Sequence, residues 1–535
     1  MKLRSVILFG LAALLTSIAA CEAPVPPIRA RVLVDGREIV VTSNEPLSVR
    51  QLLTRAGVSY GGLDRINPND FTSVTDGMII TIVRVENRPE CVNDVLAYAT
   101  ETVRTPDLPP GETRIMQPGV NGTVRVCYDV VLEDGVERSR TLSSRTIITP
   151  AVNQVVFLGV DMSRIEPIPV PGLIAYVSGG QARTIERNST NQGSLPTGGL
   201  LDADRVFALS NDGRQLLFTR RPENPESGIY NELWVLLDTS DPAAQPVRLI
   251  IDNVLTADWI PGQPFTFSYS TLQPRDEPPG YQALNDLYIA RLDSRTGELL
   301  RADPVVRPAP AGVYGPWGTV FAWSLDGGRL AWAQADRIGL VDVDAGALRV
   351  MINFAAYTTT LSNRRLWRPS LGWSSEGGLI AASVHGPPLA DESPETSPAF
   401  DVAVFHPDGR FVVNPMIAGT GMWAAPRYSP LITGADGNAQ GYIAYLQARD
   451  PINSVTSEYD LVLTDRDGSN PRTLFPGPSR PGIRPLEDGS DIAWSPTGGQ
   501  IAVVYQGDIH VIDVETGSAT VVTVVGNAQH PRWVR

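Results

Sequence analysis

The residues with the clearest capacity for chemistry form an acidic cluster near the end of the chain, Asp465-Arg466-Asp467-Gly468-Ser469-Asn470. Carboxylates at alternate positions around a glycine suit a cation loop, a catalytic pair or a tight turn between two strands. A calcium loop of the EF-hand kind also needs a bidentate Glu at its twelfth position, and that position, counted from Asp465, is Pro476. The pattern therefore favours a turn, in which Asp and Asn accept backbone hydrogen bonds and glycine permits a positive φ.

Other catalytic and ligand-binding motifs are missing from the sequence. There is no HExxH zinc helix, no P-loop, no GxGxxG between strand and helix, and no CxxC pair. The stretch GPSRPG from Gly477 misses the GxSxG nucleophile elbow, and SLDGGRLAW from Ser324 has the wrong spacing for a sialidase Asp box. The four histidines are His385, His406, His510 and His530, of which His510 is interpreted as a packed strand residue rather than a base. We therefore predict no enzyme activity and no catalytic, cofactor-binding or metal-binding residue.

The composition indicates a mainly all-β chain with more than one domain. The chain of 535 residues is too long for a single hydrophobic core, which favours two or more domains. Its 48 Gly and 45 Pro suit many short strands joined by tight turns. The net charge is −14 and the 44 basic residues are dispersed, so nucleic acid is not an expected partner. The single lysine, Lys2, lies in a segment that we expect to be removed, which leaves no lysine for Schiff-base chemistry.

The N-terminus has the pattern of an export signal. Residues 1–20 combine two positive charges with an apolar run that is too short to favour a spanning helix. The sequence Ile18-Ala19-Ala20-Cys21 resembles the bacterial lipoprotein box, which implies a lipid on Cys21 and a tether over residues 21–29. An ordinary signal peptide is the alternative. We expect an extracytoplasmic protein, anchored only through the Cys21 lipid to the cell membrane or outer membrane of a bacterium.

Two further cysteines, Cys91 and Cys127, remain after Cys21. An oxidising compartment and an even number of thiols favour a disulfide between them. A metal site is the weaker alternative, because two sulfurs with no histidine nearby make a poor zinc site.

Residues 30–85 predict a small β-grasp-like domain. ARVLVDGREIVVTS reads as a hairpin that turns at Asp35-Gly36, and LSVRQLLTRAG reads as a helix between an N-cap at Ser48 and a stop at Gly57. This segment resembles the domain of unknown function that precedes G-five domains in resuscitation-promoting factors. A LysM module, suggested by INPND and DGMIITI, is the alternative.

Residues 86–160 resemble a G-five domain, through the stretch from PDLPPGETRIMQPGVNGTVRV to NQVVFLGV. The stretch holds five glycines at turns or strand ends, Gly111, Gly119, Gly122, Gly135 and Gly159. The resemblance implies an elongated, single-sheet rod that is proposed to bind N-acetylglucosamine-containing glycans of the peptidoglycan. A spacer without ligand is the alternative.

Residues 171–535 contain a repeat. An aromatic-Ser turn and an apolar strand recur in FALSNDGRQLLF, FAWSLDGGRLAW, LGWSSEGGLIAA and IAWSPTGGQIAV, and a second pair of strands follows each copy. Four short strands that recur roughly every 40 to 65 residues indicate a β-propeller. Trp259, Trp323, Trp373, Trp494 and Trp533, with Leu209 and Tyr428 at equivalent places, give seven blades, with six or eight as alternatives. The final copy stops at AQHPRWVR, so both ends of the domain should close one blade.

The repeats resemble those of TolB-like propellers, a WD-like class with many roles, so fold does not fix function. We expect a non-catalytic envelope lipoprotein whose propeller binds a protein or peptide and whose N-terminal modules act as a spacer or contact peptidoglycan. Insertions at 273–286 and 385–400 are candidate binding loops. The alternatives are a cell-wall glycan or peptide hydrolase, which should show converging carboxylates on the propeller axis, and a purely structural spacer.

Overall fold

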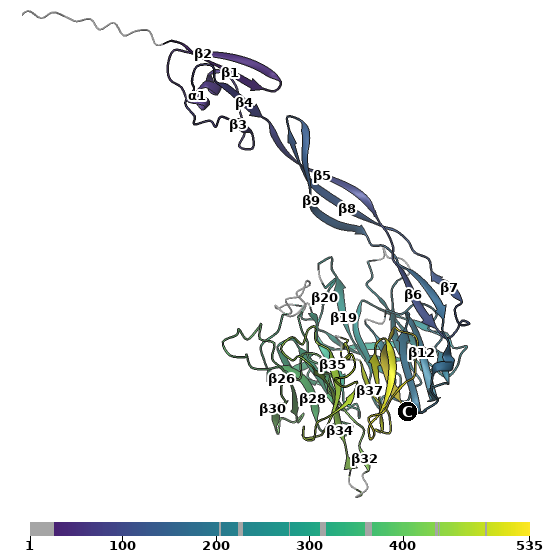
Figure 1. Cartoon of the computed structure of the whole chain (residues 1–535). Helices are drawn as coiled ribbons and strands as arrows, with labels where there is room; N and C mark the ends of the chain where they lie inside the picture. The colour runs from purple at the N-terminus through teal and green to yellow at the C-terminus, as the bar shows by residue number, and fades with distance from the viewer. Residues whose placement is uncertain are drawn as a thin grey trace, which may run out of the picture. The chain divides into compact units, whose positions relative to one another are not determined.

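The computed structural model in Figure 1 describes residues 26–202, 205–222, 228–277, 279–310, 317–358, 366–433, 437, 439–486, 489 and 491–535. The expected signal and Cys21 lie outside these residues. The described residues form two compact units, one within residues 26–100 and 117–154 and the other within residues 101–116 and 155–535. Within the described ranges, no helix is both long enough and apolar enough to cross a membrane.

The first unit begins with a four-stranded sheet and one helix. Its elements are β1 (Ile28–Val34), β2 (Arg37–Ser43), α1 (Val49–Arg55), β3 (Arg65–Asn67) and β4 (Ile79–Val83), in the sheet order β2-β1-β4-β3. The β1-β2 turn has positive φ at Asp35 and Gly36, as a two-residue hairpin requires. Ser48 and Gln51 cap the start of α1 reciprocally, and its Leu52 packs in the core of the sheet.

The same unit continues as a single layer of three long strands, β5 (Val85–Leu96), β8 (Gly122–Glu133) and β9 (Val136–Thr149), in the order β5-β8-β9. Val130 in the central strand is fully buried although no second layer covers it. Arg140 of β9 bonds Glu90 and Glu137 at 2.9 Å each, and its guanidinium lies 5.4 Å from the centroid of the Tyr128 ring. Long charged side chains thus cover the central strand in place of a packed layer.

A second three-stranded sheet belongs, apart from its end residues, to the second unit. It consists of β6 (Thr100–Thr105), β7 (Thr113–Gln117) and β10 (Gln154–Gly159), in the order β6-β10-β7, and is followed by the short helix η1 (Met162–Arg164). A small core joins Val103, Leu108, Val155 and Phe157. The segment 86–160 is therefore two successive single-layer sheets and not one continuous sheet.

The rest of the second unit is a β-propeller, in which the described residues form six four-stranded sheets and one five-stranded sheet. We number these blades 1 to 7 along the chain. Blade 1 contains β41 (Ala528–Val534), β11 (Pro169–Ser178), β12 (Gln181–Asn188) and β13 (Gln192–Ser194). Blade 2 contains β14 (Phe207–Leu209), β15 (Leu216–Arg220), β16 (Glu232–Leu236) and β17 (Val247–Asp252). Blade 3 contains β18 (Val254–Trp259), β19 (Thr266–Pro274), β21 (Leu287–Leu292) and β22 (Leu299–Val306), with β20 (Tyr281–Ala283) paired to β19.

The remaining blades repeat this order. Blade 4 contains β23 (Val320–Trp323), β24 (Leu330–Gln334), β25 (Arg337–Asp342) and β26 (Ala347–Asn353). Blade 5 contains β27 (Leu371–Trp373), β28 (Ile380–His385), β29 (Phe400–Phe405) and β30 (Val412–Ile417). Blade 6 contains β31 (Arg427–Tyr428), β34 (Tyr442–Ala448), β35 (Tyr459–Asp465) and β36 (Arg472–Phe475), with the hairpin of β32 (Ile432–Thr433) and β33 (Ala439–Gln440). Blade 7 contains β37 (Ile492–Trp494), β38 (Gln500–Tyr505), β39 (Asp508–Asp513) and β40 (Ala519–Val521).

Blade 1 is closed by both ends of the propeller, as the truncated last repeat predicts. The C-terminal strand β41 pairs antiparallel with β11, and Trp533 lies opposite Ile174. This pairing stabilises the ring because neither terminal strand is left as an open edge beside its neighbours.

The repeat tryptophans hold neighbouring blades together. The indole of Trp259 in blade 3 donates to the carbonyl of Ala208 in blade 2 at 3.0 Å, and that of Trp373 in blade 5 donates to Ala322 in blade 4 at 2.8 Å. Trp494 makes the same bond to Arg427 at 3.1 Å. All five repeat tryptophans are buried, so they are core residues and not ligand-stacking residues.

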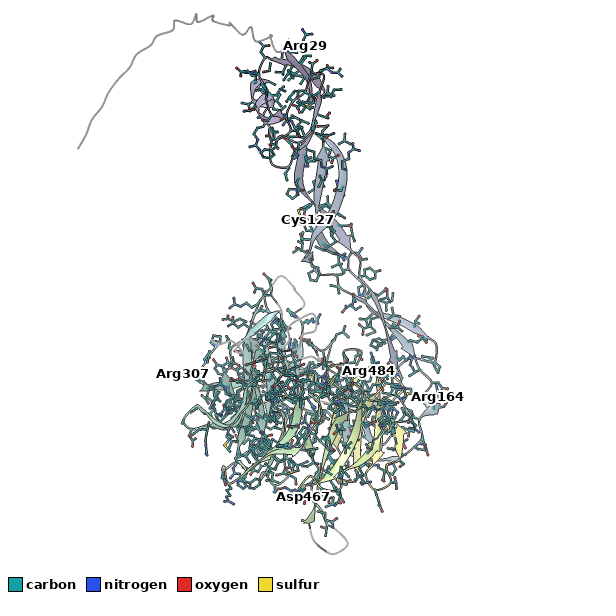
Figure 2. All side chains as sticks on the ribbon, turned by 60° about the vertical axis from the view of Figure 1, so that its left-hand side comes forward. Arg29, Cys127, Arg164, Arg307, Asp467 and Arg484 are labelled. Carbon is teal, nitrogen blue, oxygen red and sulfur yellow. A yellow bond between two sulfur atoms is a disulfide. The ribbon has the colours of Figure 1, made fainter. Side chains whose placement is uncertain are left out.

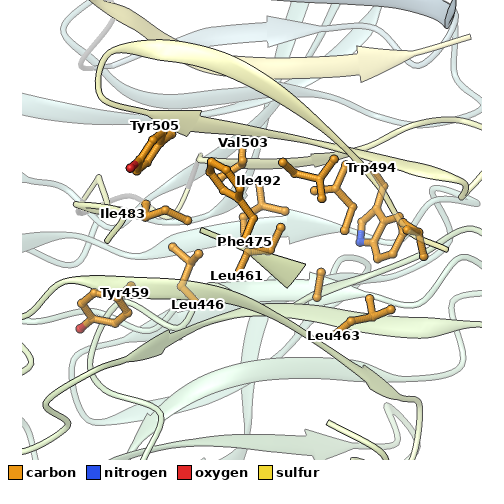
Figure 3. Packing of buried hydrophobic residues seen from close by; sticks show 14 of the residues in the cluster. Leu446, Tyr459, Leu461, Leu463, Phe475, Ile483, Ile492, Trp494, Val503 and Tyr505 are labelled. Atoms are coloured by element: carbon orange, nitrogen blue, oxygen red, sulfur yellow. The ribbon is translucent and has the colours of Figure 1, made fainter. Parts of the chain in front are cut away.

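The serine after each aromatic residue fixes the following turn. In four copies its hydroxyl accepts the backbone N–H of the residue five places on, as in Ser374 to Leu379 at 2.9 Å. In the fifth, Ser429 accepts the N–H of Tyr442, on the far side of an inserted hairpin. Apolar side chains of adjacent blades then fill the space between the sheets, as Figure 3 shows for Trp494, Phe475 and Leu463 of blades 6 and 7.

Candidate functional site

The acidic cluster that opened the sequence analysis forms the turn between β35 and β36. The N–H of Gly468 bonds the carbonyl of Asp465 at 3.0 Å, and the Asn470 amide donates to the Asp465 carboxylate at 2.6 Å. Gly468 and Asn470 both have positive φ. Hydrogen bonds from Ser469 lower the pKa of Asp467, so its carboxylate serves the turn itself. Figure 2 labels Asp467 at the lower end of the propeller.

The cysteines and histidines are placed apart. Cys91 and Cys127 face each other on β5 and β8 and form a disulfide. The four histidines lie on or beside strands of three different blades. Within the described part of the chain, no three His, Cys, Asp or Glu side chains are grouped so that they could hold a metal ion.

The centre of the propeller is lined by the first strands of the blades, which contact one another. The residues that precede the repeat aromatic or Leu209 are Ala208, Asp258, Ala322, Gly372, Arg427, Ala493 and Arg532. Only one of these is a carboxylate. Part of the Asp258 side chain is open to solvent at the centre of the ring. The strands around it still remove much of the water that would solvate its carboxylate, and this raises its pKa to about 6. The positive charge of Arg532 lowers the same pKa.

The two ends of the propeller differ in their connections. In an antiparallel meander the first-to-second and third-to-fourth turns share one end, and the second-to-third connections lie at the other. The second-to-third connections are only two residues long in blades 1, 4 and 7, at 179–180, 335–336 and 506–507. They are much longer in blades 2, 3, 5 and 6, at 221–231, 275–286, 386–399 and 449–458. We call this the loop-bearing end; β20 marks it in Figure 1.

The blade 5 loop is tied down by a histidine. His385 is 2% exposed, and its Nδ1 and Nε2 lie 2.7 and 2.6 Å from the carbonyl oxygens of Ala355 and Ser397. Its ring also contacts Tyr357 and Phe400 edge-on or tilted, at 5.4 and 5.1 Å between centroids. Sequence reasoning did not single out this role, because nothing in the chain near His385 marks the carbonyls that it contacts.

The blade 6 loop is held by one arginine. Arg449 bonds Asp460 at 2.8 Å and Glu458 at 3.1 Å, and it donates to the carbonyls of Gly477 and Arg480 at 2.7 and 2.9 Å. The hydrogen bond to Asp460 is the main cause of the raised pKa of Arg449. The two carbonyl bonds connect the loop to the segment that follows β36. The backbone of the loop is therefore ordered before a partner binds, which lowers the entropic cost of binding.

Between blades 2 and 3 the same end carries an arginine-aromatic group. Arg205 donates to the Tyr230 hydroxyl at 2.7 Å, and its guanidinium lies 4.7 Å from the centroid of the Tyr281 ring. Arg205 and Tyr230 are partly exposed. Tyr and Arg are the residues most enriched in the energetic centres of protein interfaces.

Two domain models match the N-terminal part of the chain. The G5 domain matches residues 88–160, and the G5-linked-Ubiquitin-like domain matches residues 31–69. The second match favours the first of the two interpretations of residues 30–85 over a LysM module.

The resuscitation-promoting factor RpfB of Mycolicibacterium smegmatis is 27% identical over 125 residues, which cover 23% of this chain and 34% of that protein. The chain thus spans about a third of the length of this curated relative.

Solved structures resemble the propeller only in fold. A protein described as TolB of Agrobacterium tumefaciens is 15% identical with a TM-score of 0.31, covering 58% of this chain and 90% of its own. The periplasmic gluconolactonase PpgL of Pseudomonas aeruginosa is 14% identical with a TM-score of 0.39, covering 68% and 99%. The chain therefore combines a G5-linked ubiquitin-like domain and a G5 domain with a β-propeller.

Proposed function

We propose that this chain is a non-catalytic binding protein of the bacterial cell envelope and that the loop-bearing end of its propeller holds a protein or peptide partner. The observation that carries the proposal is the uneven length of the second-to-third connections, which are extended in four blades and minimal in three. Loops on a rigid scaffold are where binding residues concentrate. The arginine-aromatic group and the two fixed loops give that end ordered contact surface.

The remaining modules are proposed to carry the propeller outside the cytoplasm. The lipid on Cys21 would anchor the chain, and the ubiquitin-like and G5 domains would act as a spacer that also contacts N-acetylglucosamine glycans of peptidoglycan. The exposed faces of the β5-β8-β9 sheet support a contact role, since its edge strand β9 is exposed along its whole length. Loss of labelled palmitate in a Cys21→Ser variant and retention of the first unit on purified peptidoglycan would test these two parts separately.

Capture from the native envelope tests the partner at the loop-bearing end. The comparison uses the whole chain and a variant in which residues 386–399 are replaced by Ala335-Asp336, the two-residue turn of blade 4. A matched control carries Asp467→Ala at the opposite end. The proposal expects one captured protein that the loop variant loses and the control retains; equal capture by both would overturn it.

A hydrolase acting at the propeller axis is the second candidate, and Asp258 is the observation in its favour, because a carboxyl group with a pKa of about 6 can act as a general acid. Glycoside hydrolysis ordinarily needs two carboxylates, and the equivalent positions supply one. Release of reducing sugars or free amino groups from peptidoglycan by the wild type, lost in Asp258→Asn, would favour this candidate over binding.

A further inference from the structure

A cavity of about 580 Å³ lies in the second unit between the β6-β10-β7 sheet and blade 7. One wall holds Arg104 of β6 and residues that follow β10, and the other holds the turn between β38 and β39 with the outer part of blade 7. The lining residues are Arg104, Val160, Asp161, Arg164, Tyr505, Gln506, Asp508, His510, Val521 and Val524. Small-molecule sites commonly measure about 300 to 1,000 Å³.

The β6-β10-β7 sheet is fixed to blade 1, which packs against blade 7. Arg183 of β12 is 1% exposed, and it bonds Asp107 at 2.7 Å and the Thr105 hydroxyl at 2.8 Å, both at the end of β6. Gly179 lies so close to β6 that a Cβ there would be 2.1 Å from Val103. The cavity is therefore formed before any ligand arrives, which lowers the entropic cost of binding.

Two guanidinium groups line the cavity without a direct ion pair to a described residue, and the charge of Asp161 acts on Arg164 only from a distance. Among the described residues, neither Arg104 nor Arg164 forms an ion pair or a side-chain hydrogen bond. Figure 2 labels Arg164 near the edge of the propeller. A guanidinium group without an ion-pair partner can bind a carboxylate through two parallel N–H donors.

Two carboxylates also line the cavity, and each keeps acceptor capacity. Asp508 accepts the Thr523 hydroxyl at 2.9 Å and the N–H of Gly526 at 3.0 Å through a single oxygen, Oδ1. Asp161 accepts the N–H of Ser163 at 3.0 Å at the start of η1. An ionised carboxylate has about four acceptor positions, so both can take a further donor.

The rest of the lining is apolar or held rigid. Val160, Val521 and Val524 supply an aliphatic surface. The ring of His510 is fixed between Phe475 and Tyr505, at 5.4 and 5.2 Å between centroids. The cavity thus offers unpaired positive groups, negative groups with free acceptor positions, and a small aliphatic surface.

We propose that this cavity binds a short zwitterionic peptide with small aliphatic side chains, whose carboxylate pairs with Arg104 and Arg164 and whose ammonium group donates to Asp161 and Asp508. An inorganic anion would pair only with the two arginines and would leave the two carboxylates without a cationic partner. The site is distinct from the loop-bearing surface of blades 2, 3, 5 and 6, so it does not depend on the proposed partner.

Titration of the full chain with tri-alanine tests this assignment. Binding should weaken at least tenfold when the peptide is acetylated at its N-terminus or amidated at its C-terminus. It should also weaken at least tenfold in Arg104→Gln and in Arg164→Gln, both exposed positions whose replacement should leave the thermal transition unchanged. Arg214→Ala, an exposed arginine on a blade 2 turn, is the matched control.

Three results would overturn the proposal. If millimolar tri-alanine does not bind to the full chain, the proposal is wrong. Equal binding of the acetylated and amidated peptides shows that charge is not recognised, and competition by inorganic phosphate at the same affinity shows a site for anions alone. The variant lacking residues 386–399 should bind tri-alanine normally, which separates this site from the proposed partner surface.

Discussion

The guanidinium of Arg183, almost wholly buried in blade 1, bonds the carboxylate of Asp107 at 2.7 Å and so joins the second G5 sheet to the propeller. Asp107 keeps about half of its side chain exposed. Asp107→Asn should lower the free energy of unfolding by about 2 kcal/mol, less than for a fully buried pair, because solvent screens the carboxylate. Urea unfolding followed by tryptophan fluorescence measures this, since all ten tryptophans lie in residues 171–535.

The same pair predicts a pH dependence. Hydrogen bonds from Arg183 hold the pKa of Asp107 below its usual value in the folded state. A carboxyl group with a lowered folded-state pKa stabilises the fold above its unfolded pKa of about 3.9 and loses this effect as pH falls through the folded pKa. The stability difference between wild type and Asp107→Asn should therefore be constant from neutral pH to about pH 5 and shrink below about pH 4. A difference that persists unchanged at pH 3 would contradict this account.

The disulfide should stabilise the first unit alone. Cys91 and Cys127 are separated by 36 residues, and closing such a loop contributes roughly 3 to 4 kcal/mol in the chain-entropy model. The double variant Cys91→Ser/Cys127→Ser should exchange the amide hydrogens of β8 faster than the oxidised wild type. Its tryptophan-monitored unfolding should be unchanged, because the propeller belongs to the other compact unit. Equal exchange in β8 would argue against a stabilising role.

The indole bonds between blades give a fourth prediction. Trp373→Phe removes the donor to the Ala322 carbonyl and leaves a small cavity, which should cost about 1 to 3 kcal/mol. Phe411→Leu, at an exposed position in the same blade, should change stability by less than about 0.5 kcal/mol. Chemical denaturation of the two variants compares them; a smaller loss for Trp373→Phe than for the control would show that the bond is not structural.

The blade 5 loop should loosen without its histidine. His385→Phe keeps the aromatic packing but removes the two ring nitrogens that contact the Ala355 and Ser397 carbonyls. Limited proteolysis should then cleave within residues 386–399 at least several times faster than in wild type. His406→Phe, in the turn after β29, is the control and should leave that rate unchanged.

The repeat made the propeller predictable, because each copy carries the same aromatic-Ser turn and the last copy lacks the strands found at Pro171. The interpretation of Asp465 as a turn followed from its sister copies. The division of residues 86–160 into two sheets was not predictable, since strand periodicity marks elements but does not specify which strands pair. Asp258 could have been found by alignment of the copies, because Ala or Gly stands at its place in blades 2, 4, 5 and 7. The raised pKa of Asp258 depends on strands distant in sequence.

The central claim is that the partner meets the loop-bearing end, and site-specific photo-crosslinking in the native envelope tests it most directly. The photoreactive residue replaces Leu389 or Ile452 in the blade 5 and blade 6 loops, or Leu325 in a blade 4 turn at the opposite end; their exposed fractions are 38%, 53% and 50%. The account predicts the same protein adduct from Leu389 and Ile452 and none from Leu325. An adduct from Leu325 alone, or equally from all three positions, would contradict it.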